Sequence, residues 1–143
     1  MRLFLIFLTL TGLTACKVSR GNVGYTRQEM LNRVIGELTP ENGFTSVECE
    51  SDSPQTVAAC YVTNVPHIKI DPLLKMSELQ GIELLQDWQE RGLNLAKIYA
   101  YKDEADKPYQ IGLLYFPIKN RSDKKYQNIR ESSAFEVYID KGN

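Results

Sequence analysis

The chain of 143 residues carries 17 basic and 18 acidic side chains, a formal net charge of −1. This near balance predicts neither nucleic-acid binding nor a strong attraction to anionic membrane surfaces. Eight tyrosines and five phenylalanines, with 24% charged residues, argue against disorder. The length suits a single domain with a substantial core.

An apolar run of eleven residues, 3–13, follows Met1-Arg2. As a helix it would rise about 16 Å, against roughly 30 Å of hydrocarbon in a bilayer, so it is too short to span a membrane. A basic start, a short apolar stretch and small residues before a cleavage point are typical of a removed secretory signal. Cleavage before residue 16 removes one charged residue, Arg2, and leaves 16 basic against 18 acidic side chains.

The four residues that end this segment, Leu13-Thr14-Ala15-Cys16, resemble the lipobox of bacterial lipoproteins. The resemblance implies that residues 1–15 are a signal peptide, and that the Cys16 sulfur carries a diacylglyceryl group, usually with a third acyl chain on the amino group. Two or more chains give stable attachment, whereas one gives marginal binding. Lys17 replaces the aspartate associated with inner-membrane retention, which favours the outer membrane, facing the periplasm. An ordinary signal peptide with a chance cysteine is the alternative.

After the lipidated cysteine, the sequence predicts a short linker to residue 24 and a single α+β domain over 25–143. Thr26 and Glu29 form a capping-box pattern that predicts a helix start. The next apolar residues share one helical face and end before Pro40: Met30, Leu31, Val34, Ile35 and Leu38.

Cys49 and Cys60 form an even pair once Cys16 is acylated, and disulfides persist in exported proteins. They lie on two segments in which apolar and polar residues alternate, at about 44–50 and 57–63. The residues between these segments are typical of a turn. If Cys49 lies opposite Cys60 in an antiparallel hairpin, one face carries both the disulfide and the neighbouring valines. The sequence therefore predicts a structural disulfide, with two free buried thiols as the alternative.

Residues 65–70 could extend the second strand or form a short edge strand, which Asp71-Pro72 would end. A second capping-box pattern at 77–80 then predicts a helix over 77–91, with Gly92 as its C-terminal cap. Its apolar face would hold Ile82, Leu84, Leu85 and Trp88, together with Gly81, which we attribute to the close approach of another backbone. Glu83, Asp87 and Glu90 would form its solvated face.

Three β segments follow, at 94–101, at 109–116 and around 135–139. In the last of these, Phe135, Val137 and Ile139 alternate with polar residues, the clearest two-residue period in the chain. The predicted order is α-β-β-α-β-β-β, an α+β domain with an antiparallel sheet and two helices packed on one face.

No nucleophile motif, phosphate-binding glycine loop or metal-ligand spacing is present in the sequence. The single histidine, His67, would be a surface residue on an edge strand. Together with Cys49 and Cys60 it would supply only three metal ligands, at irregular spacing. We therefore expect no enzyme, metal or cofactor. A hydrolase with an unrecognised pair of carboxylates is the alternative.

The stretch 119–130 contains five basic residues and one acidic residue. It is either a solvated loop or a contact with an acidic partner, such as an envelope protein, a lipid headgroup or cell-wall carboxylates. The candidate contact residues are Lys119, Arg121, Lys124, Lys125, Tyr126 and Arg130.

These observations predict a membrane-anchored envelope lipoprotein that acts as a non-catalytic interaction module in the periplasm. The alternative is an immunity or inhibitor lipoprotein that neutralises a toxin or hydrolase reaching the periplasm. The compartment excludes nucleic acid as a partner.

Overall fold

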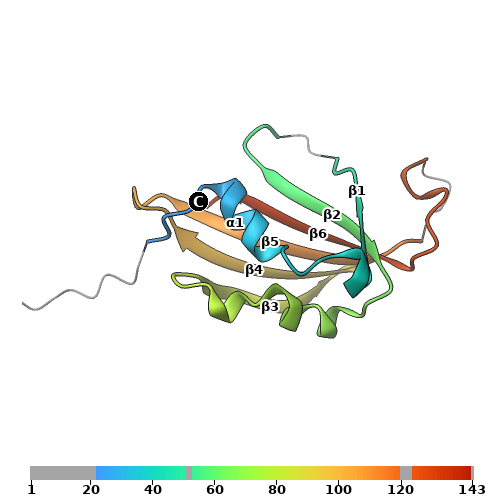
Figure 1. Ribbon diagram of the computed structural model, residues 1–143. Coiled ribbons are helices and arrows are strands. Elements are labelled where there is room, and N and C mark those ends of the chain that lie inside the picture. Colours follow the sequence, from blue (N-terminus) through green and yellow to red (C-terminus); the bar gives the residue numbers. More distant parts are fainter. Residues whose placement is uncertain (1–21, 51–52, 120–123, 143) are drawn as a thin grey trace, which may run out of the picture.

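A computed structural model of the chain describes residues 22–50, 53–119 and 124–142 (Figure 1). The signal segment and Cys16 therefore lie outside the described residues. The α-helices are α1 (Arg27–Val34) and α2 (Asp71–Leu74), and the 3₁₀ turns are η1 (Pro40–Asn42), η2 (His67–Lys69), η3 (Met76–Glu78) and η4 (Lys124–Tyr126). The strands are β1 (Phe44–Val47), β2 (Val57–Thr63), β3 (Glu83–Arg91), β4 (Asn94–Lys102), β5 (Pro108–Pro117) and β6 (Ser133–Lys141).

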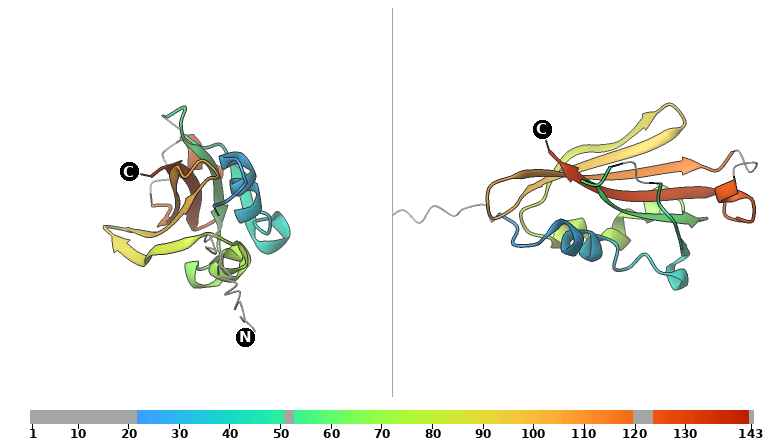
Figure 2. Two further views of the ribbon diagram at one scale, coloured as in Figure 1. Left: turned by 90° about the vertical axis from the view of Figure 1, so that its left-hand side faces the viewer. Right: turned by 90° about the horizontal axis from the view of Figure 1, so that it is seen from above.

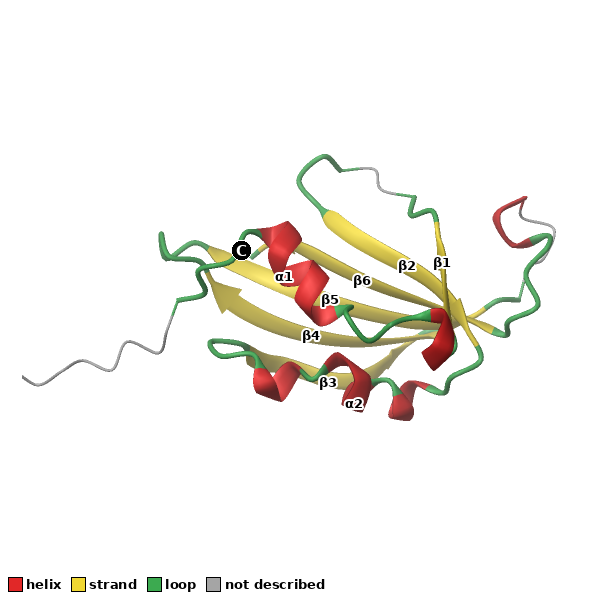
Figure 3. Ribbon diagram, in the orientation of Figure 1, coloured by secondary structure: helices red, strands yellow, loops and turns green. Residues whose placement is uncertain are grey.

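All six strands belong to one antiparallel sheet with the order β1-β2-β6-β5-β4-β3. The predicted class, a small α+β domain built on an antiparallel sheet, is confirmed. Strands β3 to β6 form a meander, and the β1–β2 hairpin pairs with its last strand. β2 lies next to the edge strand β1, and β3 forms the opposite edge. The segment between β2 and β3 must therefore cross the width of the sheet. Figure 2 shows α1 and the helical turns between β2 and β3 on one side of the sheet, and Figure 3 shows the short helical turns of this crossing segment beside β3.

The predicted capping box starts α1. The Thr26 hydroxyl accepts the Glu29 N–H at 3.2 Å, and the Glu29 carboxylate accepts the Thr26 N–H at 2.8 Å. Three residues of the predicted apolar face are buried in the core: Met30, Leu31 and Val34. The helix ends at Val34, but a turn carries the chain on so that Leu38 is also buried.

The core lies between α1, the crossing segment and the inner face of the sheet. Phe135, Val137 and Ile139 of β6 are all fully buried, as the two-residue period predicts. Burying a side chain of this size stabilises the fold by about 1.5–3 kcal/mol. The central strands therefore supply one side of the core, and α1 and the crossing segment supply the other.

The predicted helix over 77–91 is wrong, because residues 83–91 form the edge strand β3. Gly92, interpreted above as a helix cap, instead opens the two-residue hairpin loop between the paired residues Arg91 and Asn94. Its φ of +67° suits the first position of such a loop, which favours glycine. Gly81 likewise has a φ of +80° at the turn before β3. This backbone conformation, and not the close approach of another backbone, explains why a glycine stands at this position.

Two register irregularities explain why β3 does not have a strand-like sequence. The pairing with β4 shifts between Leu84 and Gln86, and again between Gln86 and Gln89. Each bulge adds a residue to one strand and interrupts the alternation of apolar and polar side chains. The local pattern therefore favours a helix, while pairing with β4 decides the structure.

The crossing segment corrects two further expectations. Residues 65–70 do not extend β2, since η2 begins at His67. Asp71-Pro72, expected to break a strand, begins the four-residue helix α2. Proline fits the first turn of a helix, where its fixed φ is favourable and its missing N–H is not needed.

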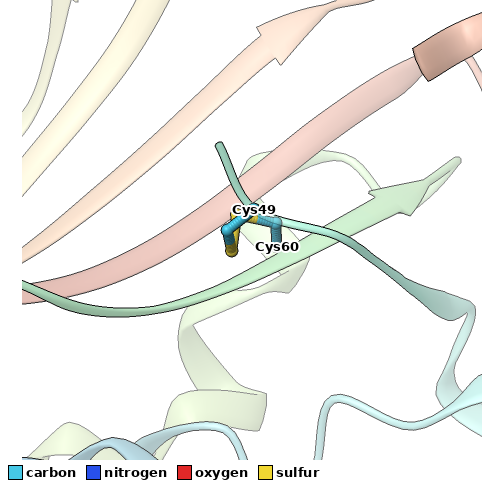
Figure 4. Close-up of a disulfide and its surroundings, with 2 residues drawn as sticks. All are labelled: Cys49 and Cys60. Carbon is cyan, nitrogen blue, oxygen red and sulfur yellow. A yellow bond between two sulfur atoms is a disulfide. The ribbon is translucent and has the colours of Figure 1, made fainter. Parts of the chain in front are cut away.

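Cys49 and Cys60 are joined by a disulfide, as predicted, with their Cα atoms 5.4 Å apart (Figure 4). The predicted register is wrong, however. A pairing of Cys49 with Cys60 would bring Val47 opposite Val62, but Val47 lies opposite Cys60, and β1 ends at Val47. Cys49 therefore lies beyond the paired ladder, and its side chain reaches Cys60, whose other neighbour is Glu136 of β6. The bond fastens the end of the short edge strand to the sheet.

We predict that Cys49→Ala lowers the free energy of unfolding by about 2–4 kcal/mol, because the unfolded chain loses a covalent constraint. Chemical denaturation measures this loss, and Cys49→Ala/Cys60→Ala should lose about as much as the single variant. Thiol counting on denatured, unreduced Cys16→Ser protein should find no reactive thiol. Two reactive thiols per chain would contradict the pairing.

Candidate interaction surface

Lys97 is a charged residue buried on the inner face of β4, with only 7% of its surface exposed. Its Nζ lies 3.0 Å from Asp71 Oδ2, at the start of α2, and 3.2 Å from Asp87 Oδ1, on β3. The three residues come from three different elements. We refer to them as the ion cluster, and it joins the crossing segment to the edge strand.

Aromatic rings surround the ion cluster. The Trp88 Nε1–H donates to Asp71 Oδ2 at 3.1 Å. The His67 ring packs between Trp88 and Tyr115, with centroid distances of 5.5 and 5.7 Å. The Tyr115 hydroxyl in turn donates to the carbonyl of Val65 at 3.1 Å. The single histidine is thus half-buried in η2 and holds an aromatic contact, rather than lying on an edge strand as expected.

The charges of the ion cluster stabilise one another. Burial alone would lower the pKa of Lys97, but hydrogen bonds with Asp71, Tyr99 and Asp87 outweigh it and raise the pKa above its ordinary value. The pKa of Asp87 is lowered, first by the Trp88 backbone N–H at 2.8 Å and then by Lys97. The Lys97 amine therefore stays protonated at neutral pH, and it cannot act there as a nucleophile or a general base.

Large apolar side chains are exposed next to this cluster. Among the described residues, five large hydrophobic side chains are exposed, and four of them lie on β3, on its hairpin loop or on η2. Their exposed fractions are Ile68 68%, Leu93 65%, Leu85 51% and Leu84 47%. We name these four residues the apolar strip. The helix predicted over 77–91 would bring Leu84 and Leu85 onto its apolar face, and this expectation is wrong because both are exposed on β3.

Acidic side chains accompany the apolar strip. Glu83, Asp87 and Glu90 are exposed on β3 rather than on a helix, and Asp87 forms an ion pair with Lys97. Charges and bulges on an edge strand discourage pairing with a strand of another chain. The edge is therefore better suited to side-chain contacts than to the addition of a strand.

The predicted contact loop is only partly available to a partner. Lys119, Lys124 and Arg130 are exposed, while Arg121 lies outside the described residues. Tyr126 is half-buried, and it packs with Ile129 against a second apolar cluster made by Val62, Ile118 and Ala134. Lys125 is also half-buried, with its Nζ 5.4 Å from the Tyr126 ring centroid. Tyr126 thus helps to hold the loop on the sheet, and the exposed charges come mainly from the lysines and Arg130.

Sequence reasoning missed the ion cluster. One signal was present: Lys97 occupies an inward position in the alternation of Leu95, Tyr99 and Tyr101, where a charge needs a partner. The partner itself could not be identified, since Asp71 lies 26 residues away in the chain.

No family model, curated protein or solved structure matches this chain. Over the described ranges, no helix is long and apolar enough to cross a membrane. Within the same ranges, no group of three or more histidine, cysteine, aspartate or glutamate side chains could hold a metal ion.

We predict that Lys97→Met lowers the free energy of unfolding by about 1–3 kcal/mol. Removing one member of a buried ion pair costs about 3–5 kcal/mol, and here both carboxylates retain contact with water, which reduces the loss. Lys102→Met on the same strand is the matched control. It removes an exposed amine, so we expect a change within about 0.5 kcal/mol.

The pH dependence of this difference gives a second readout. Because its folded pKa is raised, Lys97 contributes stability that is complete below the unfolded value of about 10.4 and is lost at higher pH. Because the folded pKa of Asp87 is lowered, its contribution is present above an unfolded value of about 3.9 and is lost as pH falls below it. Denaturation of wild type and Lys97→Met should therefore differ equally at pH 6 and pH 9. No difference at either pH would contradict the role of the ion cluster.

Proposed function

We propose that this protein is a lipid-anchored lipoprotein of the bacterial envelope that binds a partner protein and catalyses no reaction. The apolar strip is the observation that carries the proposal. Several large apolar side chains that are exposed along one edge of a sheet are typical of an interaction site. The ion cluster fixes the backbone that presents them, so the surface is preorganised for binding.

The anchor rests on Leu13-Thr14-Ala15-Cys16. Acylation of Cys16 would hold the domain at the membrane, in our proposal the outer membrane facing the periplasm. The domain would add little of its own to that attachment, since the mature chain has 16 basic against 18 acidic side chains.

A non-catalytic role is supported by what the reactive side chains do. The Lys97 amine remains protonated between two carboxylates. The His67 ring is occupied by packing against Trp88 and Tyr115. Each of these groups has a structural contact that accounts for its position.

The chemistry of the apolar strip favours a protein as partner. Leucine and isoleucine side chains are stabilised when they leave water and enter an apolar groove. Cell-wall carboxylates do not offer such a groove. The exposed lysines of 119–130 would then steer the domain toward an acidic region of that protein. An immunity or inhibitor lipoprotein would use the same surface against a periplasm-acting toxin, and a neighbouring toxin gene would favour this second function.

We predict that Cys16 is acylated and is the first residue of the mature chain. Metabolic labelling with a fatty-acid analogue should label wild type, while Cys16→Ser should carry no label and escape lipoprotein processing. Label that persists in Cys16→Ser would contradict the anchor.

We predict that the Leu84→Ser/Leu85→Ser variant loses partner capture from detergent-solubilised envelopes at both low and high salt, because its contribution is apolar. Lys124→Glu/Lys125→Glu should weaken capture mainly at low salt, since charge contacts are screened over about 8 Å at physiological ionic strength. The leucine variant should keep wild-type thermal stability, because exposed substitutions usually change it by less than about 0.5 kcal/mol. The lysine variant also loses the contact of Lys125 with the Tyr126 ring, so we expect a loss of about 0.5–1 kcal/mol.

Equal recovery by wild type and the leucine variant would contradict the interaction surface. Equal recovery by wild type and the lysine variant in both salts would mean that 119–130 is an ordinary solvated loop. Co-sedimentation with purified peptidoglycan, tested separately, would reveal a cell-wall ligand instead of a protein.

A further inference from the structure

The first described residues of the chain are fastened to the turn between β4 and β5. The Val23 N–H donates to the Lys102 carbonyl at 2.8 Å, and Val23 forms a parallel bridge with Asp103. The Val23 side chain is buried, with 5% of its surface exposed. The Asn22 side-chain amide also donates to Asp106 at 3.4 Å. The chain therefore enters the domain at a fixed place, the β4–β5 end.

Leu93 and the lysines of 119–130 lie at the other end of the same strands, whereas Leu84 and Leu85 lie at the start of β3, near the β4–β5 end. Leu93 is in the hairpin loop where β4 begins, and the loop that contains Lys124 joins β5 to β6. A strand of nine residues, such as β4, spans about 30 Å. Figure 1 and Figure 2 show the first described residues, in blue, at one end of the sheet and the β5–β6 connection at the opposite end. We call this opposite end the distal end.

The distance between the acylated cysteine and the domain is bounded by the covalent chain alone. Cys16 and Asn22 are six residues apart. In any conformation, six residues span at most about 22 Å. The β4–β5 end therefore stays close to the bilayer, while the distal end lies about 30 Å further along the strands.

We propose that the β4–β5 end faces the membrane and that the distal end points away from it. The inference rests on the proposed acylation of Cys16. It assigns a direction to the distal part of the interaction surface: Leu93 and the lysines of 119–130 meet a partner in the space beyond the membrane. They do not bind headgroups of the leaflet that holds the anchor.

The β4–β5 end is held near the bilayer by the chain and not by its charges. Its turn carries three acidic side chains and two basic ones: Asp103, Glu104 and Asp106, with Lys102 and Lys107. Anionic lipid headgroups attract basic segments and repel acidic surfaces. The end that faces the bilayer is thus tethered by the chain without adhering to the lipid surface.

Two matched variants test the direction. Lys107→Cys places a label at the β4–β5 end and Lys124→Cys places one at the distal end, and both lysines are exposed. The Cys49–Cys60 disulfide leaves the introduced cysteine as the reactive thiol once Cys16 is acylated. The acylated, fluorescently labelled chains are inserted into phosphatidylcholine vesicles that carry a short-range quencher on the lipid headgroup.

We expect the label at Lys107→Cys to be quenched several-fold more than the label at Lys124→Cys. Equal quenching, or stronger quenching at the distal label, would overturn the direction. In vesicles that also contain phosphatidylglycerol, we expect the same ranking. A rise of distal quenching to the proximal level there would show that the basic loop binds headgroups, which would also overturn the proposal.

Flotation of the vesicles separates this inference from the proposed function. Chains that float with the vesicles but show equal quenching would contradict the direction alone. Chains that do not float, with Cys16→Ser as the reference for an unanchored protein, would contradict the anchor and the direction together.

Discussion

The ammonium group of Lys97 lies between a carboxylate from α2 and a carboxylate from β3, and this contact ties the crossing segment to the edge of the sheet. Taking an ammonium out of water is costly, so such a pair adds less to stability than its Coulomb energy suggests. Its larger effect is geometric. Asp71 also accepts from Trp88, so one carboxylate sets the position of a helix, a lysine and a ring on β3.

The exposed leucines follow from that arrangement. With Trp88 directed to Asp71, β3 is held as the outermost strand, and its two bulges interrupt the alternation of its side chains. Leu84, Leu85 and Leu93 then remain in water, although burial of such side chains is normally favourable by about 1.5–3 kcal/mol each. A partner that covers them would recover this free energy, which is why we assign binding to this edge.

Features set by neighbouring residues could be predicted from the sequence. The capping box of Thr26 and Glu29, the alternation of β6 and the pairing of Cys49 with Cys60 each depend on short spacings, and each is present in the fold. The identity of β3 could not be predicted, because its bulges remove the two-residue period and its structure depends on pairing with β4. The prediction of the hairpin register was wrong by a smaller error, because nothing in the sequence indicates that β1 ends two residues before Cys49.

We propose that the edge formed by β3 and its hairpin loop contacts a partner protein in the envelope. Site-specific photo-crosslinking in living cells tests it most directly. A photoreactive amino acid replaces Leu85 or Leu93, and Asn32, an exposed residue of α1, provides the control position. We predict a discrete crosslinked species from both leucine positions and none from Asn32. No crosslink from either leucine, or the same species from all three positions, would contradict the account.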